Sequence, residues 1–259
     1  LRQGQQPVIE SVMNGYSAAA IFPTGSGKSL CYQLPATMLP NLTLVISPLL
    51  ALMKDQLSFL QSKGIAAASI DSSQSREEAQ RVMVGVKNGE IKILMISVER
   101  LKNERFREFI RPVPISLMVV DEAHCISEWG HNFRPDYLKL PQYQRELNIP
   151  QTLLLTATAT PAVIEDMQNN FDIASDHITV TGFYRSNLDI SVIPCGESEK
   201  QTQLKTIVAA APKLPTIVYV TQQQTAEQVA KSLIHIGVNA HAYHAGMKSE
   251  VREQIQQQF

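Results

Sequence analysis

Cysteine is scarce in this sequence. Three cysteines, Cys31, Cys125 and Cys195, are scattered through 259 residues. Their odd number and the absence of Cys-x-x-Cys spacing give no support for a disulfide framework or for a zinc module. A reducing compartment such as the cytosol fits this pattern best.

The sequence also lacks a long apolar run and an excess of charge of either sign. No stretch reaches the roughly 18 apolar residues of a membrane helix and no signal peptide is visible, so we expect no membrane partner. The formal net charge is −1, so composition gives no support for nucleic-acid binding, although a local groove can be basic on a neutral protein. With 44% hydrophobic and 18% charged residues, the composition is that of an ordinary globular protein with ample material for a core.

What the sequence does contain is a glycine loop directly after an apolar run. Residues 18–22 are apolar, and positions 23–29 read Pro-Thr-Gly-Ser-Gly-Lys-Ser. Such a loop turns backbone N–H groups around a polyphosphate, and the helix that opens at Lys28-Ser29 adds partial positive charge. Lys28 adds a full charge, and the Ser29 hydroxyl suits Mg²⁺. Phe22 stands where the full pattern G-x-x-x-x-G-K-[ST] begins with glycine. We predict a nucleoside triphosphate site formed by Thr24, Gly25, Ser26, Gly27, Lys28 and Ser29. The alternative is an ordinary glycine turn with an exposed lysine.

A second motif follows a later apolar run, at residues 116–122. Four consecutive apolar residues there suit a central parallel strand buried on both faces, and Asp121 and Glu122 follow them. Open α/β sheets bind their ligands at the carboxyl ends of the strands. We therefore predict that Asp121 holds Mg²⁺ and that Glu122 orients or deprotonates an attacking water. An isolated Asp-Glu pair would instead be a solvated turn, but the glycine loop upstream argues against that interpretation.

Apolar runs that suit strands alternate with helical patterns over the first part of the chain. The strand-like runs are 17–22, 42–47, 66–70, 91–97, 115–121, 151–156 and 177–181. The helical patterns are Val8–Met13, Lys28–Met38, Leu49–Lys63, Ser75–Lys87 and Val163–Asn170. This alternation predicts the α/β class, with a mainly parallel sheet covered by helices on both faces.

A second α/β series begins after about residue 182. It has strand-like segments near 188–193, 215–220 and 239–243, a helix over Thr225–Ile236 and a helical pattern at 249–259. We therefore expect two domains, 1–181 and 182–259. The chain starts without Met and stops inside a helical pattern, so we expect the second domain to be incomplete.

With these two motifs in place, further segments resemble a known family. Asp121-Glu122-Ala123-His124 resembles the DEAH box of superfamily 2 helicases, and Thr156-Ala157-Thr158 resembles their coupling motif. The run Cys125-Ile126-Ser127-Glu128-Trp129-Gly130-His131-Asn132-Phe133-Arg134-Pro135 is similar to the aromatic-rich loop of RecQ DNA helicases. Arg2-Gln3-Gly4-Gln5 resembles the adenine-reading motif of that family, and 47–56 its motif Ia. Segments 183–188 and 243–247 resemble parts of its second motor domain. Glu128 and Asn132 depart from the Gln and Asp that are common in bacterial members.

The resemblance implies two RecA-like domains that bind ATP with Mg²⁺. By likeness, Lys28 contacts the β- and γ-phosphates, while Ser29 and Asp121 hold the metal. Glu122 positions the water, Gln5 hydrogen-bonds the adenine edge and Arg2 packs near the base. Without the resemblance to this family, Gln5 would be interpreted as an exposed surface glutamine. The family's arginine finger, zinc-binding region and winged helix are expected beyond Phe259.

The DNA contacts are expected in the aromatic segment. Trp129 and Phe133 flank His131, with Arg134 adjacent; aromatics stack on bases and arginine holds phosphate. Composition alone instead favours Trp129, the single tryptophan, as an anchor in a domain core. A further metal site at His124, His131 and Cys125 lacks a fourth ligand at suitable spacing.

His124, Thr156 and Thr158 are expected to form a polar network that links ATP to DNA. Alternatively, the two threonines are strand-end hydroxyls that satisfy buried backbone. Lys54 and Gln56 are weaker candidates for contacts to the DNA backbone.

These implications favour the motor core of an ATP-dependent DNA helicase of 3′-to-5′ polarity, acting on single-stranded DNA and duplex junctions. We expect it in the bacterial cytoplasm with the nucleoid, or in the nucleus if it is eukaryotic. An RNA helicase and a nucleotide-dependent binding module without motor activity stay open as alternatives.

Overall fold

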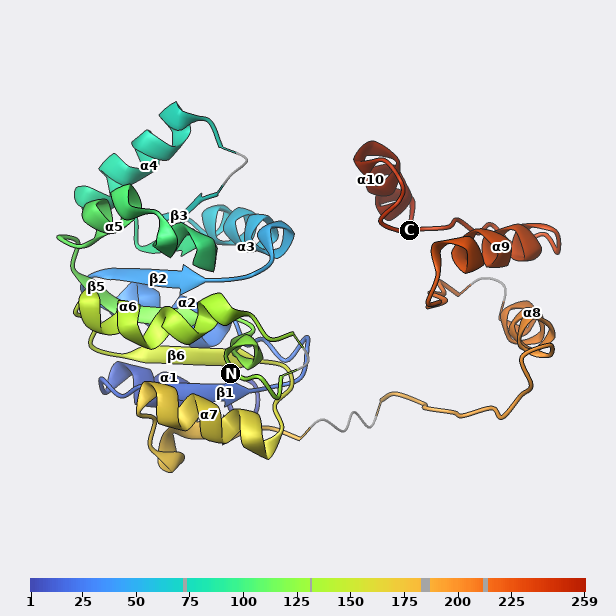
Figure 1. Ribbon diagram of the computed structural model, residues 1–259, viewed down its shortest axis with the longest axis horizontal. Helices are drawn as coiled ribbons and strands as arrows, with labels where there is room; N and C mark the ends of the chain where they lie inside the picture. Colours follow the sequence, from blue (N-terminus) through green and yellow to red (C-terminus); the bar gives the residue numbers. More distant parts are fainter. Residues whose placement is uncertain (72–73, 131, 183–186, 212–213) are drawn as a thin grey trace. The chain divides into compact units, whose positions relative to one another are not determined.

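Seven strands form one sheet in which every pair is parallel (Figure 1). Their order across the sheet is β3-β4-β2-β5-β6-β1-β7. In chain order they are β1 Ala18–Ile21, β2 Leu42–Ile46, β3 Ala67–Ile70, β4 Ile93–Ile96, β5 Ile115–Val120, β6 Thr152–Thr156 and β7 Ile178–Val180. All seven coincide with the apolar runs of the first part of the sequence, so the predicted parallel sheet is confirmed.

The computed structural model describes residues 1–71, 74–130, 132–182, 187–211 and 214–259. The chain divides into a first unit, Leu1–Arg185, and a second unit, Ser186–Phe259. The expected boundary near 182 adjoins residues 183–186, which lie outside the described residues together with most of the segment 183–188. Within the described ranges, no helix combines the length and apolar character needed to cross a bilayer.

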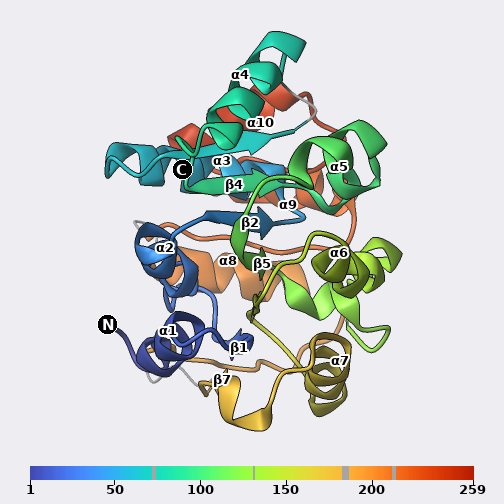
Figure 2. The same cartoon turned by 90° about the vertical axis from the view of Figure 1, so that its left-hand side faces the viewer.

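Helices cover both faces of the sheet, which explains why its central strands are apolar without alternation (Figure 2). One face packs against helices α1 Gln5–Met13, α2 Leu30–Met38 and α3 Leu50–Ser62. The other packs against α4 Arg76–Lys87, α5 Glu104–Ile110, α6 Leu140–Glu146 and α7 Pro161–Phe171. In β5, for example, Met118 faces the α4–α7 side, Val119 faces the α1–α3 side, and both are fully buried. Short 3₁₀ helices complete the unit: η1 Val98–Lys102, η2 Ala123–Ile126, η3 Pro135–Lys139 and η4 Ser175–His177.

The helix starts follow local capping chemistry. At α4 the Ser75 hydroxyl accepts from the Glu78 N–H at 3.2 Å, and the Glu78 carboxylate accepts from the Ser75 N–H at 2.8 Å. At α7 the Thr160 hydroxyl accepts from the Val163 N–H, with Pro161 in the first turn. Helix α2 begins at Leu30, two residues after the expected start, because the preceding residues form tight turns.

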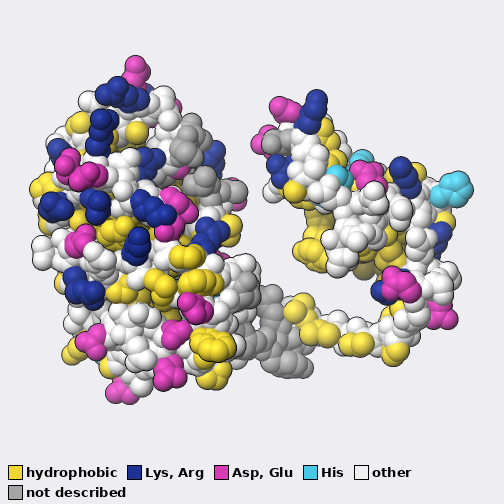
Figure 3. Space-filling view, viewed as in Figure 1, with side chains coloured by type: hydrophobic (Ala, Val, Ile, Leu, Met, Phe, Trp, Pro, Cys, Tyr) yellow, Lys and Arg dark blue, Asp and Glu magenta, His cyan; other side chains and the backbone are white. Residues whose placement is uncertain are grey.

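The second unit contains helices α8 Lys200–Ala210, α9 Gln223–Ile234 and α10 Ser249–Gln258. The strands predicted near 188–193, 215–220 and 239–243 are wrong: the described residues of this unit form no strand. A strand requires a neighbour that accepts and donates its backbone hydrogen bonds, and these segments have no such ladder within the described part of the unit. Their apolar side chains stay at the surface, with Ile190 80% and Val192 87% exposed along the segment before α8 (Figure 3).

Candidate functional site

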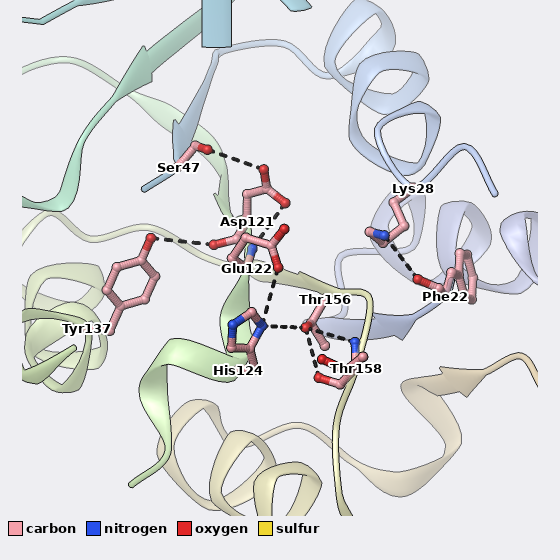
Figure 4. Close-up of polar contacts among 9 residues, drawn as sticks. All are labelled: Phe22, Lys28, Ser47, Asp121, Glu122, His124, Tyr137, Thr156 and Thr158. Atoms are coloured by element: carbon pink, nitrogen blue, oxygen red, sulfur yellow. Dashed lines mark hydrogen bonds and ion pairs between the residues drawn. The ribbon is translucent and has the colours of Figure 1, made fainter. Parts of the chain in front are cut away.

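The glycine loop leaves strand β1 at the carboxyl edge of the sheet. Gly25 and Gly27 adopt φ of 80° and 85°, which side chains rarely tolerate. Lys28 turns back over the loop, and its Nζ donates to the Phe22 carbonyl at 3.0 Å (Figure 4). Burial lowers the pKa of Lys28, while the charges of Glu122 and Asp121 oppose this shift. The lysine is therefore held between the loop and the acidic strand end.

Arg2 and Gln5 both contact the glycine loop. The Gln5 amide donates to the carbonyls of Gly27 at 2.9 Å and Ser26 at 3.3 Å, and Arg2 donates to the Gly25 carbonyl. A Cβ on Gly27 would lie 2.7 Å from the Gln5 amide nitrogen, so a side chain there would displace the end of Gln5 in addition to straining the backbone at φ 85°. Gln5 is 1% exposed, which corrects the interpretation of it as a surface residue. The predicted adenine contact stays a prediction, but both residues are placed beside the loop that would hold the phosphates.

Asp121 and Glu122 follow strand β5 and are oriented by the backbone. Oδ1 of Asp121 accepts from the Glu122 N–H at 3.0 Å, and Oδ2 accepts from the Ser47 hydroxyl at 3.3 Å. Burial raises the pKa of Asp121, and the neighbouring charge of Glu122 adds to that rise. Glu122 has φ 51°, an uncommon left-handed conformation that turns the chain out of the strand direction.

His124 connects the acidic strand end to strand β6. Its Nδ1 lies 3.3 Å from Oε2 of Glu122 and 2.9 Å from Oγ1 of Thr156 (Figure 4). The Thr156 hydroxyl donates to the Thr158 carbonyl at 3.0 Å and accepts from the Thr158 N–H at 3.3 Å. Hydrogen bonds with the Cys125 side chain and with the Glu122 carboxylate raise the pKa of His124 to about 9. The structure therefore brings His124, Thr156 and Thr158 into one network, although the link from this network to DNA stays a prediction.

The aromatic segment leaves the same edge through η2. We call its described residues, 127–130 and 132–134, the Trp129 loop. Trp129 is 76% exposed, so its alternative role as a core anchor is wrong. Phe133 and Arg134 are half-buried, and His131 lies outside the described residues. A Cβ on Gly130 would lie 2.2 Å from the His124 carbonyl oxygen, so this glycine is required by close backbone approach beside the DEAH segment.

Several residues at this edge were missed by sequence reasoning. Ser47 ends the strand next to β5, and that position was the signal that could have found it. The buried Tyr137 hydroxyl donates to the Asp121 carbonyl at 3.5 Å. Gln56, a weaker candidate for a DNA contact, accepts from the buried Tyr32 hydroxyl of α2, and its contact to DNA stays a prediction. No sequence pattern indicates the last two contacts, because each joins residues from different elements.

The parts of the chain that the structure describes contain no group of three or more His, Cys, Asp or Glu side chains arranged to hold a metal ion. Because His131 lies outside those parts, this finding applies to the remaining candidates, His124 and Cys125.

Comparisons with known proteins agree with this geometry. Residues 2–167 match the family described as DEAD/DEAH box helicase. The whole chain is 39% identical to the ATP-dependent DNA helicase RecQ of Haemophilus influenzae, covering 41% of that protein. It is 40% identical to the RecQ helicase of Bacillus subtilis, covering 44% of it. The resemblance seen in the sequence is thereby confirmed, and the chain spans about two fifths of the length of these curated relatives.

Solved structures share the fold at low sequence identity. The DUF1998 helicase MrfA, whose structure is described as bound to DNA, aligns over 99% of this chain and 40% of its own, with a TM-score of 0.74 and 18% identity. The Mycobacterium smegmatis helicase Lhr, described as bound to single-stranded DNA and AMP-PNP, aligns over 98% of this chain and 37% of its own, with a TM-score of 0.65 and 20% identity. At these identities the likeness concerns the fold.

Proposed function

Because the chain belongs to the DEAD/DEAH box helicase family, we propose that it is the motor core of a RecQ-type ATP-dependent DNA helicase. In this proposal it couples ATP hydrolysis to 3′-to-5′ movement along single-stranded DNA and to unwinding of duplex junctions. The identity of 38–40% to RecQ helicases over the full chain supports the RecQ type. The two units would then be a nucleotide-binding domain and part of a second motor domain.

The observation that carries the proposal is the strand order β2-β5-β6-β1. Because all four strands are parallel, their carboxyl ends meet at one edge. Ser47, Asp121 with Glu122, Thr156 and the glycine loop therefore follow one another along that edge. This is the arrangement in which open α/β sheets bind ligands.

The donor set at this edge fits a magnesium nucleotide. Carboxylate and hydroxyl oxygens are the ligands that Mg²⁺ prefers, and Asp121 and Ser29 provide one of each. Lys28 and the N–H groups of the glycine loop provide the positive side of a phosphate site. Bound ATP with Mg²⁺ supplies the phosphoanhydride whose hydrolysis drives movement.

The chain's own residues orient the reactants. Ser47 and the Glu122 N–H fix both oxygens of Asp121, so one rotamer of that carboxylate is available for a metal. Glu122 holds the attacking water and accepts its proton at Oε. The pKa of His124, raised to about 9, favours its charged form beside the Glu122 carboxylate, which lies 3.3 Å away. Because His124 contacts Thr156, a change in the position of His124 would be transmitted to the end of strand β6.

The Trp129 loop is the proposed DNA contact. Its exposed indole is available for stacking on a base, and Arg134 lies at the end of the loop that returns to η2. Since the loop begins six residues after Asp121, movement of the loop is transmitted over a short path to the carboxylates.

The test is ATP hydrolysis by the whole protein, measured alone, with single-stranded DNA and with RNA of matched length and sequence. The proposal expects DNA to stimulate hydrolysis more strongly than RNA, and expects ATP-dependent unwinding of a duplex with a 3′ single-stranded tail. Stronger stimulation by RNA would favour an RNA helicase. Hydrolysis without translocation would favour a nucleotide-dependent binding module.

A further inference from the structure

A hydrogen bond ties the base of the Trp129 loop to helix α7. The hydroxyl of Ser127, which is fully buried, donates to Oδ2 of Asp166. The Ser127 Oγ in turn accepts from the Trp129 N–H at 3.2 Å. One hydroxyl therefore joins the helix carboxylate to the backbone of the exposed tryptophan.

The backbone hydrogen bonds of the described loop residues are local. The Gly130 N–H donates to the Ser127 carbonyl at 2.9 Å, and the Arg134 N–H donates to the Cys125 carbonyl at 3.0 Å. These bonds close the loop on itself and on η2. The Ser127–Asp166 bond differs because it spans 39 residues and reaches a separate element.

Helix α7 is fixed to the core of the first unit, so a residue on it can hold the loop in place. Its inner face buries Val163, Met167 and Phe171 in the core, and Asp166 lies half-buried between the core side and the surface. The helix begins at Pro161, five residues after Thr156, which itself contacts His124. We call the carboxyl edge of the sheet that carries the glycine loop, Asp121 to His124 and Thr156 the ATP edge, after its proposed ligand. Helix α7 lies next in the chain to this edge and also contacts the loop that leaves it.

We propose that Asp166 is a positioning residue, which acts through the Ser127 hydroxyl to hold the Trp129 loop in the conformation that receives single-stranded DNA. The choice of DNA as the ligand rests on the proposed function. The anchoring of the loop by Asp166 does not depend on that function. A loop that is fixed before binding loses less conformational freedom when it binds, so its anchor contributes to affinity without touching the ligand. A hydrogen bond to a charged group is among the stronger single contacts available for this purpose.

The single tryptophan makes the anchoring directly measurable in the 259-residue chain. Time-resolved fluorescence anisotropy of Trp129 reports the motion of the loop with no activity assay. The variants are Ser127→Ala, Asp166→Ala, the double variant and Asp166→Asn, which keeps a carbonyl oxygen as acceptor. Glu165→Ala removes the neighbouring exposed carboxylate of α7 and serves as the matched control. Thermal unfolding checks that each variant is folded.

We expect Asp166→Ala and Ser127→Ala to increase the amplitude of fast Trp129 motion, and the double variant to increase it no further, since both act through one bond. Glu165→Ala should match the wild type, and Asp166→Asn, which offers only a neutral acceptor, should fall between the wild type and Asp166→Ala. Quenching of Trp129 by oligo(dT) should show affinity about threefold lower in the first three variants, a smaller loss than removal of the stacking side chain itself would cause.

Three results would overturn the inference. Unchanged Trp129 motion in folded Asp166→Ala would show that the bond does not hold the loop. Increased motion with unchanged oligo(dT) affinity would show that anchoring does not serve binding. Additive effects of the two single variants would show that they act separately. If wild-type Trp129 gave no response to oligo(dT), the proposed function would fail instead, and the anisotropy result would still decide the anchoring.

Discussion

Two neighbouring regions of the first unit differ sharply in how their side chains are held. At the ATP edge, Asp121, His124 and Thr156 lie in a connected set of hydrogen bonds with little exposure. In the Trp129 loop the largest side chain is 76% exposed, and the bonds of the loop are made by its backbone and by Ser127. Under the proposed function, the difference means that the residues of ATP hydrolysis have fixed side chains, whereas the residue that contacts DNA has an exposed one.

Removing the carboxylate of Glu122 should have the largest effect on the ATP edge. Glu122→Gln should cut turnover in the whole protein by roughly 10²–10⁴, the range for a lost general base, with ATP binding nearly intact. Steady-state phosphate release measures turnover, and Glu108→Gln, an exposed carboxylate of α5, is the control. Unchanged turnover in Glu122→Gln would contradict the role of this carboxylate.

Substitution of Lys28 should weaken ATP binding at the same edge. Lys28→Ala should weaken ATP affinity by about 30-fold or more, because truncating one partner of a partly buried charge pair is costly. Titration with a fluorescent ATP analogue measures this in the 259-residue chain, with Lys63→Ala at the exposed end of α3 as the control. Equal affinities of the two variants would place the phosphates elsewhere.

The stabilisation of the fold by His124 should depend on pH. A group whose pKa is raised in the folded state stabilises the fold fully below its ordinary pKa of 6.5, and this contribution is lost as pH rises through about 9. The difference in unfolding free energy between wild type and His124→Gln should therefore shrink by on the order of 2 kcal/mol across that window. Urea unfolding at both ends of the window measures it. A constant difference would mean that His124 is neutral in the fold.

The Trp129 loop should show the smallest effects on binding. Trp129→Ala and Arg134→Ala should each lower affinity for single-stranded DNA by about fivefold, near the lower limit for a lost stacked base. Anisotropy of labelled oligonucleotides measures the affinity, and Trp129→Phe, which keeps a stacking ring, should retain most of it. Loss of folding in Trp129→Ala would point to a structural role.

The strands of the first unit could be predicted because each one is a short apolar run that is visible in the sequence. Each run such as 115–120 is apolar on both faces and ends at a polar motif, so class, strand positions and the edge that carries the motifs all follow. Helices α5, α6 and α8 were not predicted, since α5 and α6 are only seven residues long and α8 has little apolar periodicity.

The second unit could not be predicted in the same way. Segment 215–220 has a strand-like composition, but its conformation depends on a pairing partner that local sequence does not specify. Non-local contacts explain the misses at the site as well. The buried position of Gln5 depends on the glycine loop, which lies more than 20 residues away in the sequence. The contact of Asp166 with Ser127 spans 39 residues, so the local sequence of α7 gives no sign of it.

Under the proposed function, the Trp129 loop couples DNA binding to ATP hydrolysis at the ATP edge. The most direct measurement is the ratio of ATP hydrolysis with and without single-stranded DNA in the whole protein, at saturating DNA, for wild type and Trp129→Ala. The account predicts that the variant keeps its basal rate and loses most of the stimulation, by about tenfold and by more than its loss of affinity. Full stimulation in a folded Trp129→Ala protein would contradict the account, because the exposed loop would then have no part in signalling to the carboxylates.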